Sequence, residues 1–510
     1  MVFAALVIVV ISAAVARRDF LGDGVRHLTA VLSDRPQLGE PRWLLFPVLA
    51  RFWVRLLTAM GVVHGVESSL RALLALCVAS GILFLFSLRS WLRFESTDGT
   101  RRAASLLLAG SCAPFLMLFS DIAEPQLAAG LAAAGLAYAR IRRDDPSRAE
   151  TAATWAIAGI AMATLIYQGV MLSLGMLPLV TSRRTLTSRR VLAAAVAAVL
   201  AVAVVMIGAQ IATGTPAGSA VETAFGGERN PLTRSFMVAP SPAKYLVALA
   251  AGPPQGIIAL ENFAGVRALL SSLRSHDSHE AASAFANLGI LVLGCAVTGI
   301  LLARAIRDRQ WRVLAVAAIL LALPVFRNQQ YAYVKFYIMW PIPVGLLAVR
   351  CRTRTIVVAG SIVLVVNGCL LTHEIRRGRE QYSAVQRAYA EASASTCWMT
   401  SGWAPPMPYL WPGKAAPILG TLATGSQPAD QTSALTAVLQ RCFCGSDAVW
   451  TDTTTRDTEM IKSIARHFEY RSFDLGSVLL DPGDARDLPM PGVYAYPDAR
   501  RARACLAVGR

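Results

Sequence analysis

The chain has 510 residues, of which 55% are hydrophobic and 16% are charged. Soluble domains carry about 25% charged residues, so this composition favours a polytopic membrane protein over a soluble enzyme. The formal net charge is +17, but residues 373–510 contain 15 Lys and Arg against 14 Asp and Glu, which leaves an excess of +16 in the apolar part. This distribution is typical of loops that orient a membrane protein, and it argues against nucleic acid as a partner.

The first apolar segment, residues 1–16, is followed at once by a charged stretch that reads RRDFLGDGVRH. The segment ends in a sequence similar to a signal-peptidase site, but no basic region precedes it, so we expect an uncleaved first helix. In the charged stretch, Asp23 lies between Gly22 and Gly24, which allow a substrate to approach the backbone closely. We therefore predict that Asp23 belongs to an active site outside the cytoplasm.

Residues 17–69 are predicted to form a long first outer loop that lies on the membrane. The part from 41 to 60 combines aromatic residues with arginines, a mixture that favours the headgroup region of a bilayer. Two short helices are expected in this loop, at residues 23–33 and 41–60.

Ten further apolar segments follow, which with the first helix predict about eleven membrane spans. The segment 244–262 is apolar but interrupted by Gly252, Pro253 and Pro254, so we interpret it as an interfacial or re-entrant piece of a second long outer loop, 214–285. The ten segments are residues 70–88, 103–119, 126–140, 151–166, 168–181, 190–212, 287–304, 312–326, 334–349 and 355–372.

Arginines gather in short loops that all fall on one side under this helix count, around residues 89–102, 140–143, 183–190, 304–312 and 350–354. Basic loops mark the cytoplasmic side of a membrane protein. The two long loops, the link 326–334 and residues 373–510 are then expected outside. The predicted fold is an all-α transmembrane domain, residues 1–372, in a bacterial inner (plasma) membrane, with an extracytoplasmic domain at 373–510.

The C-terminal domain is predicted to be a small α/β domain. Strand-like runs at 397–400, 448–451 and 477–480 alternate with helical runs at 433–441 and 458–467. Four cysteines there allow two disulfides if the domain lies in an oxidising compartment: Cys397, Cys442, Cys444 and Cys505. A zinc site is the weaker alternative, because the CxC spacing of the middle pair differs from CxxC.

Charged and aromatic residues are expected to meet at the outer face of the transmembrane domain. Asp121 and Glu124 lie in the tight turn between the third and fourth helices. Residues predicted at the same level are Arg26, His27, Arg42, Arg327, Lys335, Tyr331 and Tyr333. Cations can hold a phosphate, and a carboxylate can accept a proton from a hydroxyl or bind a divalent metal. The set suits an anionic lipid substrate, although acidic turns and aromatic belts are also ordinary features of membrane proteins. No set of metal ligands is predicted and no cofactor is certain, while a divalent metal bound by a carboxylate stays an open alternative.

This layout resembles the GT-C class of integral-membrane glycosyltransferases, and in particular bacterial relatives of the dolichyl-phosphate-mannose protein mannosyltransferases and of the aminoarabinose transferase. The resemblance rests on Asp23 after the first helix, the amphipathic first loop, the acidic turn at 121–124, and an aromatic-rich stretch, 327–341, before the C-terminal domain. It implies a polyprenyl-phosphate-linked sugar as donor and an envelope glycan, lipid or protein as acceptor. Asp23 would be the general base, Asp121 or Glu124 the second acidic group, and Arg or Lys side chains the phosphate ligands.

Two departures from that family pattern stand out. Many relatives have a second acidic residue beside the first-loop Asp, where this chain has glycines, and a His-Pro motif where this chain reads Glu40-Pro41-Arg42-Trp43. A transporter or flippase of a lipid-linked intermediate and a non-catalytic assembly protein are the alternatives. A transporter is expected to carry ionisable residues in its spans and often inverted repeats, and neither is evident, since Gln168 and Asn367 are uncharged. A scaffold needs no carboxylates at one membrane level.

Overall fold

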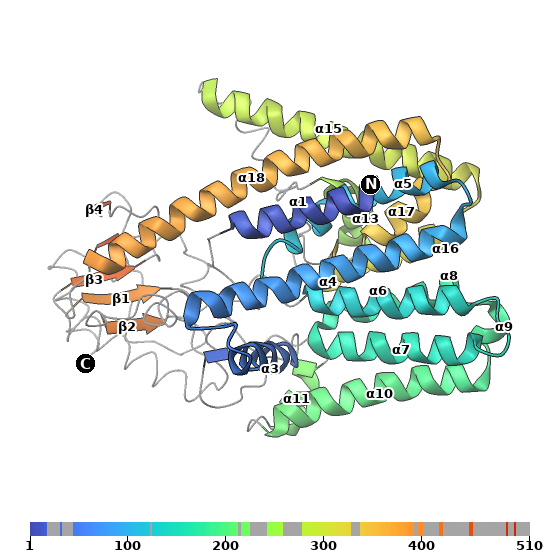
Figure 1. Ribbon diagram of the computed structural model, residues 1–510, viewed down its shortest axis with the longest axis horizontal. Coiled ribbons are helices and arrows are strands. Elements are labelled where there is room, and N and C mark those ends of the chain that lie inside the picture. Colours follow the sequence, from blue (N-terminus) through green and yellow to red (C-terminus); the bar gives the residue numbers. More distant parts are fainter. Residues whose placement is uncertain are drawn as a thin grey trace.

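Long apolar helices lie side by side in a bundle, and a small sheet stands beyond one end of it (Figure 1). The computed structural model describes residues 1–17, 31–32, 44–122, 125–212, 216–224, 242–258, 278–327 and 337–391, together with five strands between 396 and 495. All statements about the structure below concern these residues.

Five helices are long and apolar enough to cross a membrane. They are α4 (Val66–Glu95), α7 (Ala149–Ile166), α10 (Arg189–Ala212), the Leu288–Arg307 part of α15 (Ser278–Arg307) and the Thr353–Glu380 part of α18 (Thr353–Glu391). Shorter apolar helices include α1 (Val2–Ala16) and the Trp311–Leu321 part of α16 (Trp311–Arg327). The chain is therefore a multi-pass membrane protein. Every predicted apolar segment overlaps a helix, while the count of eleven spans stays a prediction.

Prolines divide three of the predicted segments, because proline lacks the N–H that continues a helix. The segment 103–119 is α5 (Gly99–Ser111) followed by a π-helical turn, η2 (Pro114–Leu118). The segment 168–181 is a 3₁₀ helix, η3 (Gln168–Met176), followed by α8 (Leu177–Val180). In the described part of the third segment, residues 337–349, the α-helix is α17 (Pro341–Ala348).

The predicted first outer loop contains an amphipathic helix, α3 (Phe46–Ala59), inside the range predicted for one. Phe46 and Val54 are buried, whereas Phe52 and Leu56 are exposed on the other side. The indole N–H of Trp53 donates a hydrogen bond of 2.8 Å to the carbonyl of Ala72 and ties α3 to α4. The exposed apolar side fits a helix that lies against lipid.

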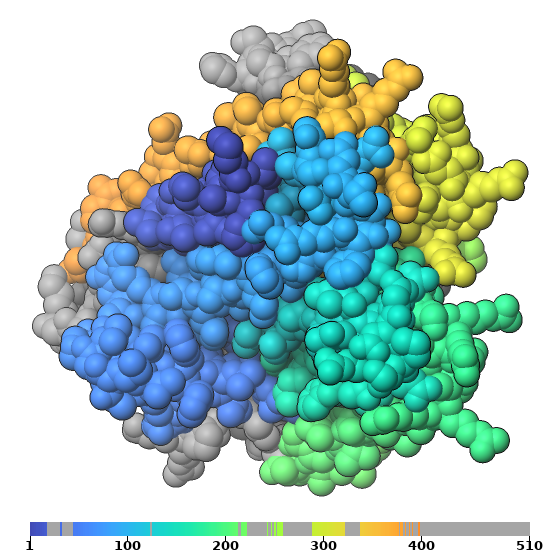
Figure 2. All heavy atoms as spheres, turned by 45° about the vertical axis from the view of Figure 1, so that its right-hand side comes forward, coloured from blue at the N-terminus to red at the C-terminus, as the bar shows by residue number. Residues whose placement is uncertain are grey.

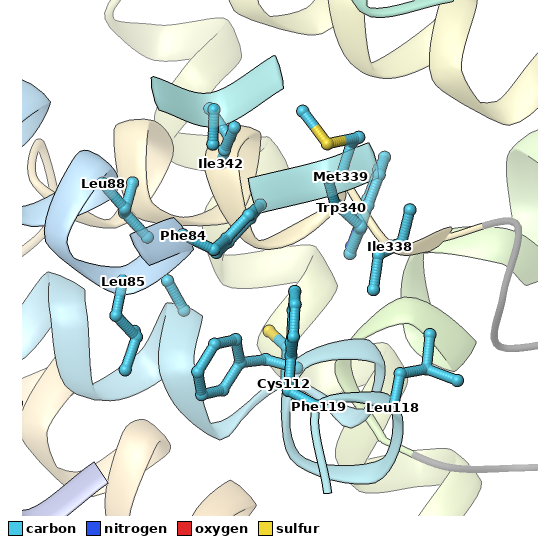
Figure 3. Close-up of a cluster of buried hydrophobic side chains, with 14 of the residues drawn as sticks. Phe84, Leu85, Leu88, Cys112, Leu118, Phe119, Ile338, Met339, Trp340 and Ile342 are labelled. Atoms are coloured by element: carbon cyan, nitrogen blue, oxygen red, sulfur yellow. The ribbon is translucent and has the colours of Figure 1, made fainter. Parts of the chain in front are cut away.

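Close helix packing holds α4 against α6 (Pro125–Arg142), which itself lies against α7 (Figure 1). A Cβ added to Gly130 would lie 2.8 Å from the carbonyl oxygen of Ser80, so only glycine fits there. Beside this contact the rings of Phe84, Phe115 and Phe119 pack with centroids 5.0 to 6.1 Å apart. Figure 3 shows Phe84 and Phe119 in this buried cluster, near Trp340. Small residues at helix contacts are the usual means of packing spans in lipid.

The segment predicted as interfacial or re-entrant forms α13 (Pro242–Ile257), and its second half is buried in the bundle. The helix ends on Ile257, whose carbonyl accepts a hydrogen bond of 2.8 Å from the amide of Asn367 on α18. The same amide donates at 2.7 Å to Ser111 at the end of α5. Carbonyls at helix ends have no partner in their own helix, so one buried side chain satisfies two of them.

The sheet has the strand order β2-β1-β3-β5-β4. Strand β1 (Thr396–Thr400) pairs in parallel with β2 (Ile418–Thr421) and β3 (Ala448–Thr451). Strand β5 (Tyr494–Ala495) pairs antiparallel with β3 and with β4 (Arg486–Asp487). Two of the predicted strands, 397–400 and 448–451, are present. The third, 477–480, and both predicted helical runs lie outside the described residues, so the α/β character of this domain stays a prediction.

Candidate functional site at the sheet end of the bundle

Four of the arginine-rich loops meet at one end of the helical bundle. Glu95 at the end of α4 pairs with Arg140 at 3.1 Å and with Arg350 at 3.5 Å. The guanidinium of Arg304 donates at 2.9 Å to the carbonyl of Arg350. The contacts join the ends of α4, α6 and α15 and the start of α18, so these predicted cytoplasmic loops do lie on one side. The sheet lies at the other end, which α18 reaches after running the length of the bundle (Figure 1).

At the end of α1 that points toward the sheet, Arg17 forms an ion pair with Asp121. The Nη1 of Arg17 lies 3.3 Å from Oδ2 of Asp121, and the two side chains are 11% and 40% exposed. The other carboxylate oxygen of Asp121 accepts a hydrogen bond of 2.7 Å from the backbone N–H of Ile122. The pair links the residue that opens the first outer loop to the turn between α5 and α6.

Local hydrogen bonds fix the turn that carries Asp121. The buried amide of Gln126 donates at 2.7 Å to the carbonyl of Leu118 and at 3.4 Å to that of Asp121. The hydroxyl of Ser120 donates to the carbonyl of Leu116 at 2.8 Å. The π-helical turn η2 therefore ends in a rigid corner.

A third segment reaches the same place from the far end of the chain. Arg379 on α18 donates a hydrogen bond of 2.8 Å to the carbonyl of Ala16, the last residue of α1. The end of α1 thus contacts the acidic turn through Arg17 and the helix that leads to the C-terminal sheet through Ala16. We call these three segments the outer-end site, after the side on which the sequence predicts them: residues 16–17, 120–122, 125–126 and Arg379.

Among the predicted catalytic and lipid-phosphate residues, Asp121 is the one whose side-chain contacts the structure describes. Arg327 is the last residue of α16, but its side chain is not described. The remaining predicted catalytic and lipid-phosphate residues lie outside the described part of the chain: Asp23, Glu124, Arg26, His27, Arg42, Tyr331, Tyr333 and Lys335.

Sequence reasoning did not single out Arg17 or Arg379. The position of Arg17 directly after the first apolar segment was a usable signal, whereas nothing in the sequence connects Arg379 to Ala16.

The described cysteines of the helical part are free, whereas the described cysteine of the sheet is disulfide-bonded. Cys397 in β1 is buried and disulfide-bonded. Its three companions in the predicted disulfide set, Cys442, Cys444 and Cys505, lie outside the described residues. The cysteines of the helical part are free: Cys77, Cys112, Cys295, Cys351 and Cys369. Disulfides persist in oxidising compartments, which agrees with an outer location for the sheet.

The outer-end site offers a carboxylate and a guanidinium that are both partly shielded from water. Such a pair can hold a charged group in place or orient a phosphate. Within the described ranges, no three His, Cys, Asp or Glu residues come close enough together to hold a metal ion.

Comparison with known proteins gives one structural likeness and no sequence match. No protein-family model matches the chain, and no curated protein matches it. Among solved structures, the chain is similar to the crystal structure of ArnT from Cupriavidus metallidurans in the apo state, with 15% sequence identity, a TM-score of 0.45 and coverage of 98% of each chain.

Proposed function

We propose that this chain is a membrane glycosyltransferase of the GT-C type, which transfers a sugar from a polyprenyl-phosphate donor to an envelope acceptor on the outer face of the plasma membrane. The observation that carries the proposal is the ion pair between Arg17 and Asp121. It ties together the two segments to which the sequence resemblance assigns the acidic groups of the site.

Chain geometry limits how far the proposed catalytic groups can lie from this pair. Asp23 follows Arg17 by six positions, and six extended residues span at most about 22 Å. Glu124 follows Asp121 by three positions, a reach of at most about 11 Å. The Cα atoms of both residues therefore lie within these distances of the ion pair, which supports the proposal of a shared site.

The contacts of Asp121 favour a positioning role for it over proton transfer. Both of its oxygens are engaged, one by Arg17 and one by the N–H of Ile122. A general base needs an oxygen that can receive the substrate proton. We therefore propose that Asp23 takes the proton and that Glu124 is the second acidic group of the site. Asp121 holds Arg17 in place.

In the proposed reaction the acceptor hydroxyl attacks the anomeric carbon of the donor sugar. The bond between that carbon and the phosphate oxygen breaks, and polyprenyl phosphate leaves with the electron pair. Asp23 takes the proton of the hydroxyl, and the anomeric configuration inverts. The cations of the outer loops, Arg26, His27, Arg42, Arg327 and Lys335, would stabilise the negative charge on the departing phosphate, with Tyr331 and Tyr333 beside them.

The test is sugar transfer by the purified full chain in liposomes. Polyprenyl-phosphate pentoses and hexoses, each labelled in the sugar, are supplied together with envelope lipid and glycan fractions as acceptors. The proposal expects label in one acceptor fraction and release of polyprenyl phosphate, both dependent on the chain. If no donor of the panel loses its sugar while lipid-linked donors are carried across the bilayer, the chain is a transporter instead.

A further inference from the structure

A cavity of about 340 Å³ lies at the end of the bundle opposite the outer-end site. The first residues of α1, the last turns of α4 and the first turns of α5 form its walls. Figure 2 shows this side of the molecule, with the dark blue N-terminal residues packed against blue surface. The volume falls in the range of ordinary small-molecule sites, about 300–1,000 Å³. Nothing in the proposed transfer reaction uses this cavity.

Three arginines line the cavity: Arg89 and Arg93 from α4, and Arg102 from α5. No acidic side chain lines it. Among the described residues, none of the three forms an ion pair, and Arg89 instead lies over the ring of Phe3, 5.3 Å from its centroid. The cavity therefore concentrates positive charge.

The neighbouring carboxylates are engaged elsewhere. Glu95 pairs with Arg140 and Arg350. Asp98 accepts hydrogen bonds from the backbone N–H groups of Thr100 and Arg101, at 2.9 and 3.2 Å, and so caps the start of α5. The first turn of α5 then faces the cavity with its positive helix end, since Gly99 and Arg102 both line it. These features together favour an anion.

The rest of the wall is apolar, with Val2, Phe3, Leu92 and Leu106 contributing to it. An inorganic anion needs cations alone, whereas a phospholipid needs cations for its phosphate and an apolar wall beside them for its chains. Two of the helices that form the cavity, α1 and α4, are apolar. The surrounding loops are the arginine-rich ones that face the anionic leaflet under the positive-inside rule.

We propose that this cavity binds the headgroup of an anionic phospholipid. The phosphate lies among Arg89, Arg93 and Arg102, and the start of an acyl chain lies along Phe3 and Leu106. A lipid bound there would hold the first residue of α1 against α4 and α5. This residue lies at the end of α1 opposite Arg17.

The experiment measures lipid protection of the full chain purified in detergent. Thermal unfolding is followed while phosphatidylglycerol, phosphatidylcholine or inorganic phosphate is added. The test variant is the triple change Arg89→Gln, Arg93→Gln and Arg102→Gln. A matched control removes three exposed arginines of the same end that lie outside the cavity, through Arg183→Gln, Arg184→Gln and Arg189→Gln.

We expect phosphatidylglycerol to raise the unfolding temperature of the wild type and of the control, and phosphatidylcholine and phosphate to leave it unchanged. The triple variant should bind phosphatidylglycerol about 10- to 100-fold more weakly. If the triple variant does not fold, the double change Arg93→Gln and Arg102→Gln, which keeps the contact between Arg89 and Phe3, serves in its place. Equal protection of variant and control, or protection by inorganic phosphate as strong as by lipid, would overturn the proposal.

Discussion

Arg17 and Asp121 lie far apart in the sequence, yet their side chains form an ion pair with a separation of 3.3 Å at the end of α1. The pair joins the end of the first helix to the turn after η2, and we call this junction the corner. Every catalytic assignment proposed for this chain depends on that corner, because it decides which loops can share a substrate.

The first prediction concerns the strength of this pair. In a double-mutant cycle of Arg17→Ala and Asp121→Asn, the two changes should show a coupling of about 1–3 kcal/mol in the free energy of unfolding, since Arg17 is 11% exposed. The change to Asn retains an oxygen for the N–H of Ile122. The control is the exposed pair Arg71 and Glu67 on α4, for which exposed helical pairs predict about 0.3–0.5 kcal/mol. Equal couplings for the two pairs would contradict a structural role for the corner.

The second prediction concerns Asn367, which donates to the last carbonyls of α5 and α13. Asn367→Leu should reduce the free energy of unfolding by about 1–3 kcal/mol, because it leaves buried carbonyls unpaired. Thr372→Val on the same helix is the control: its exposed hydroxyl bonds only to Gly368 of its own turn, and its loss should cost less than about 0.5 kcal/mol. Chemical unfolding in mixed micelles measures both, and a neutral Asn367→Leu would show that α13 is not held by this contact.

The third prediction compares two glycines that face different surroundings. Gly130→Ala should destabilise the bundle by about 1–3 kcal/mol, because the new Cβ would lie 2.8 Å from a backbone oxygen of α4. Gly208→Ala on α10 meets nothing within 4 Å and should stabilise its helix by up to about 1 kcal/mol. Unfolding of the two variants should therefore change in opposite directions. A shift of the same sign in both would argue against close packing of α4 and α6.

The amino-acid sequence predicts the helices well and their contacts poorly. Hydrophobic runs place both ends of α7 and α10 and the starts of α4 and α18 to within a few residues, because lipid selects for composition over the whole length of a span. The helices α4 and α18 continue past their predicted ends, at residues 88 and 372, to Glu95 and Glu391. Internal prolines, such as Pro114 and Pro178, end or divide helices. The mean hydropathy of a segment does not reveal these breaks.

Long-range polar contacts could not be predicted from the sequence. Asn367 was recognised as a polar residue in an apolar run, but its two partners belong to helices more than 100 positions away. Arg17 was recognised as one of several charges after the first helix, and only the folded chain brings it to Asp121. Contacts of this kind depend on how helices are arranged in space, which local patterns do not specify.

The fourth prediction concerns the compartment of the sheet. Cys397 is disulfide-bonded, whereas the five cysteines of the helical part are free. When the chain is isolated under denaturing conditions without reductant, Cys397 should resist maleimide labelling, and reduction should expose at least two new thiols. In Cys397→Ala that pair of reduction-dependent thiols should be lost. Labelling of Cys397 before reduction would contradict the disulfide and remove its support for an outer domain.

The most direct test of the central claim is the rate of sugar transfer by Asp23→Asn compared with Asp19→Asn. Both changes remove a carboxylate from the same stretch after α1, so a general loss of loop structure affects them alike. Loss of a general base lowers the rate by about 100- to 10,000-fold. The account predicts that loss for Asp23→Asn and a rate near that of the wild type for Asp19→Asn, at equal amounts of folded protein. Full transfer by Asp23→Asn would contradict the account.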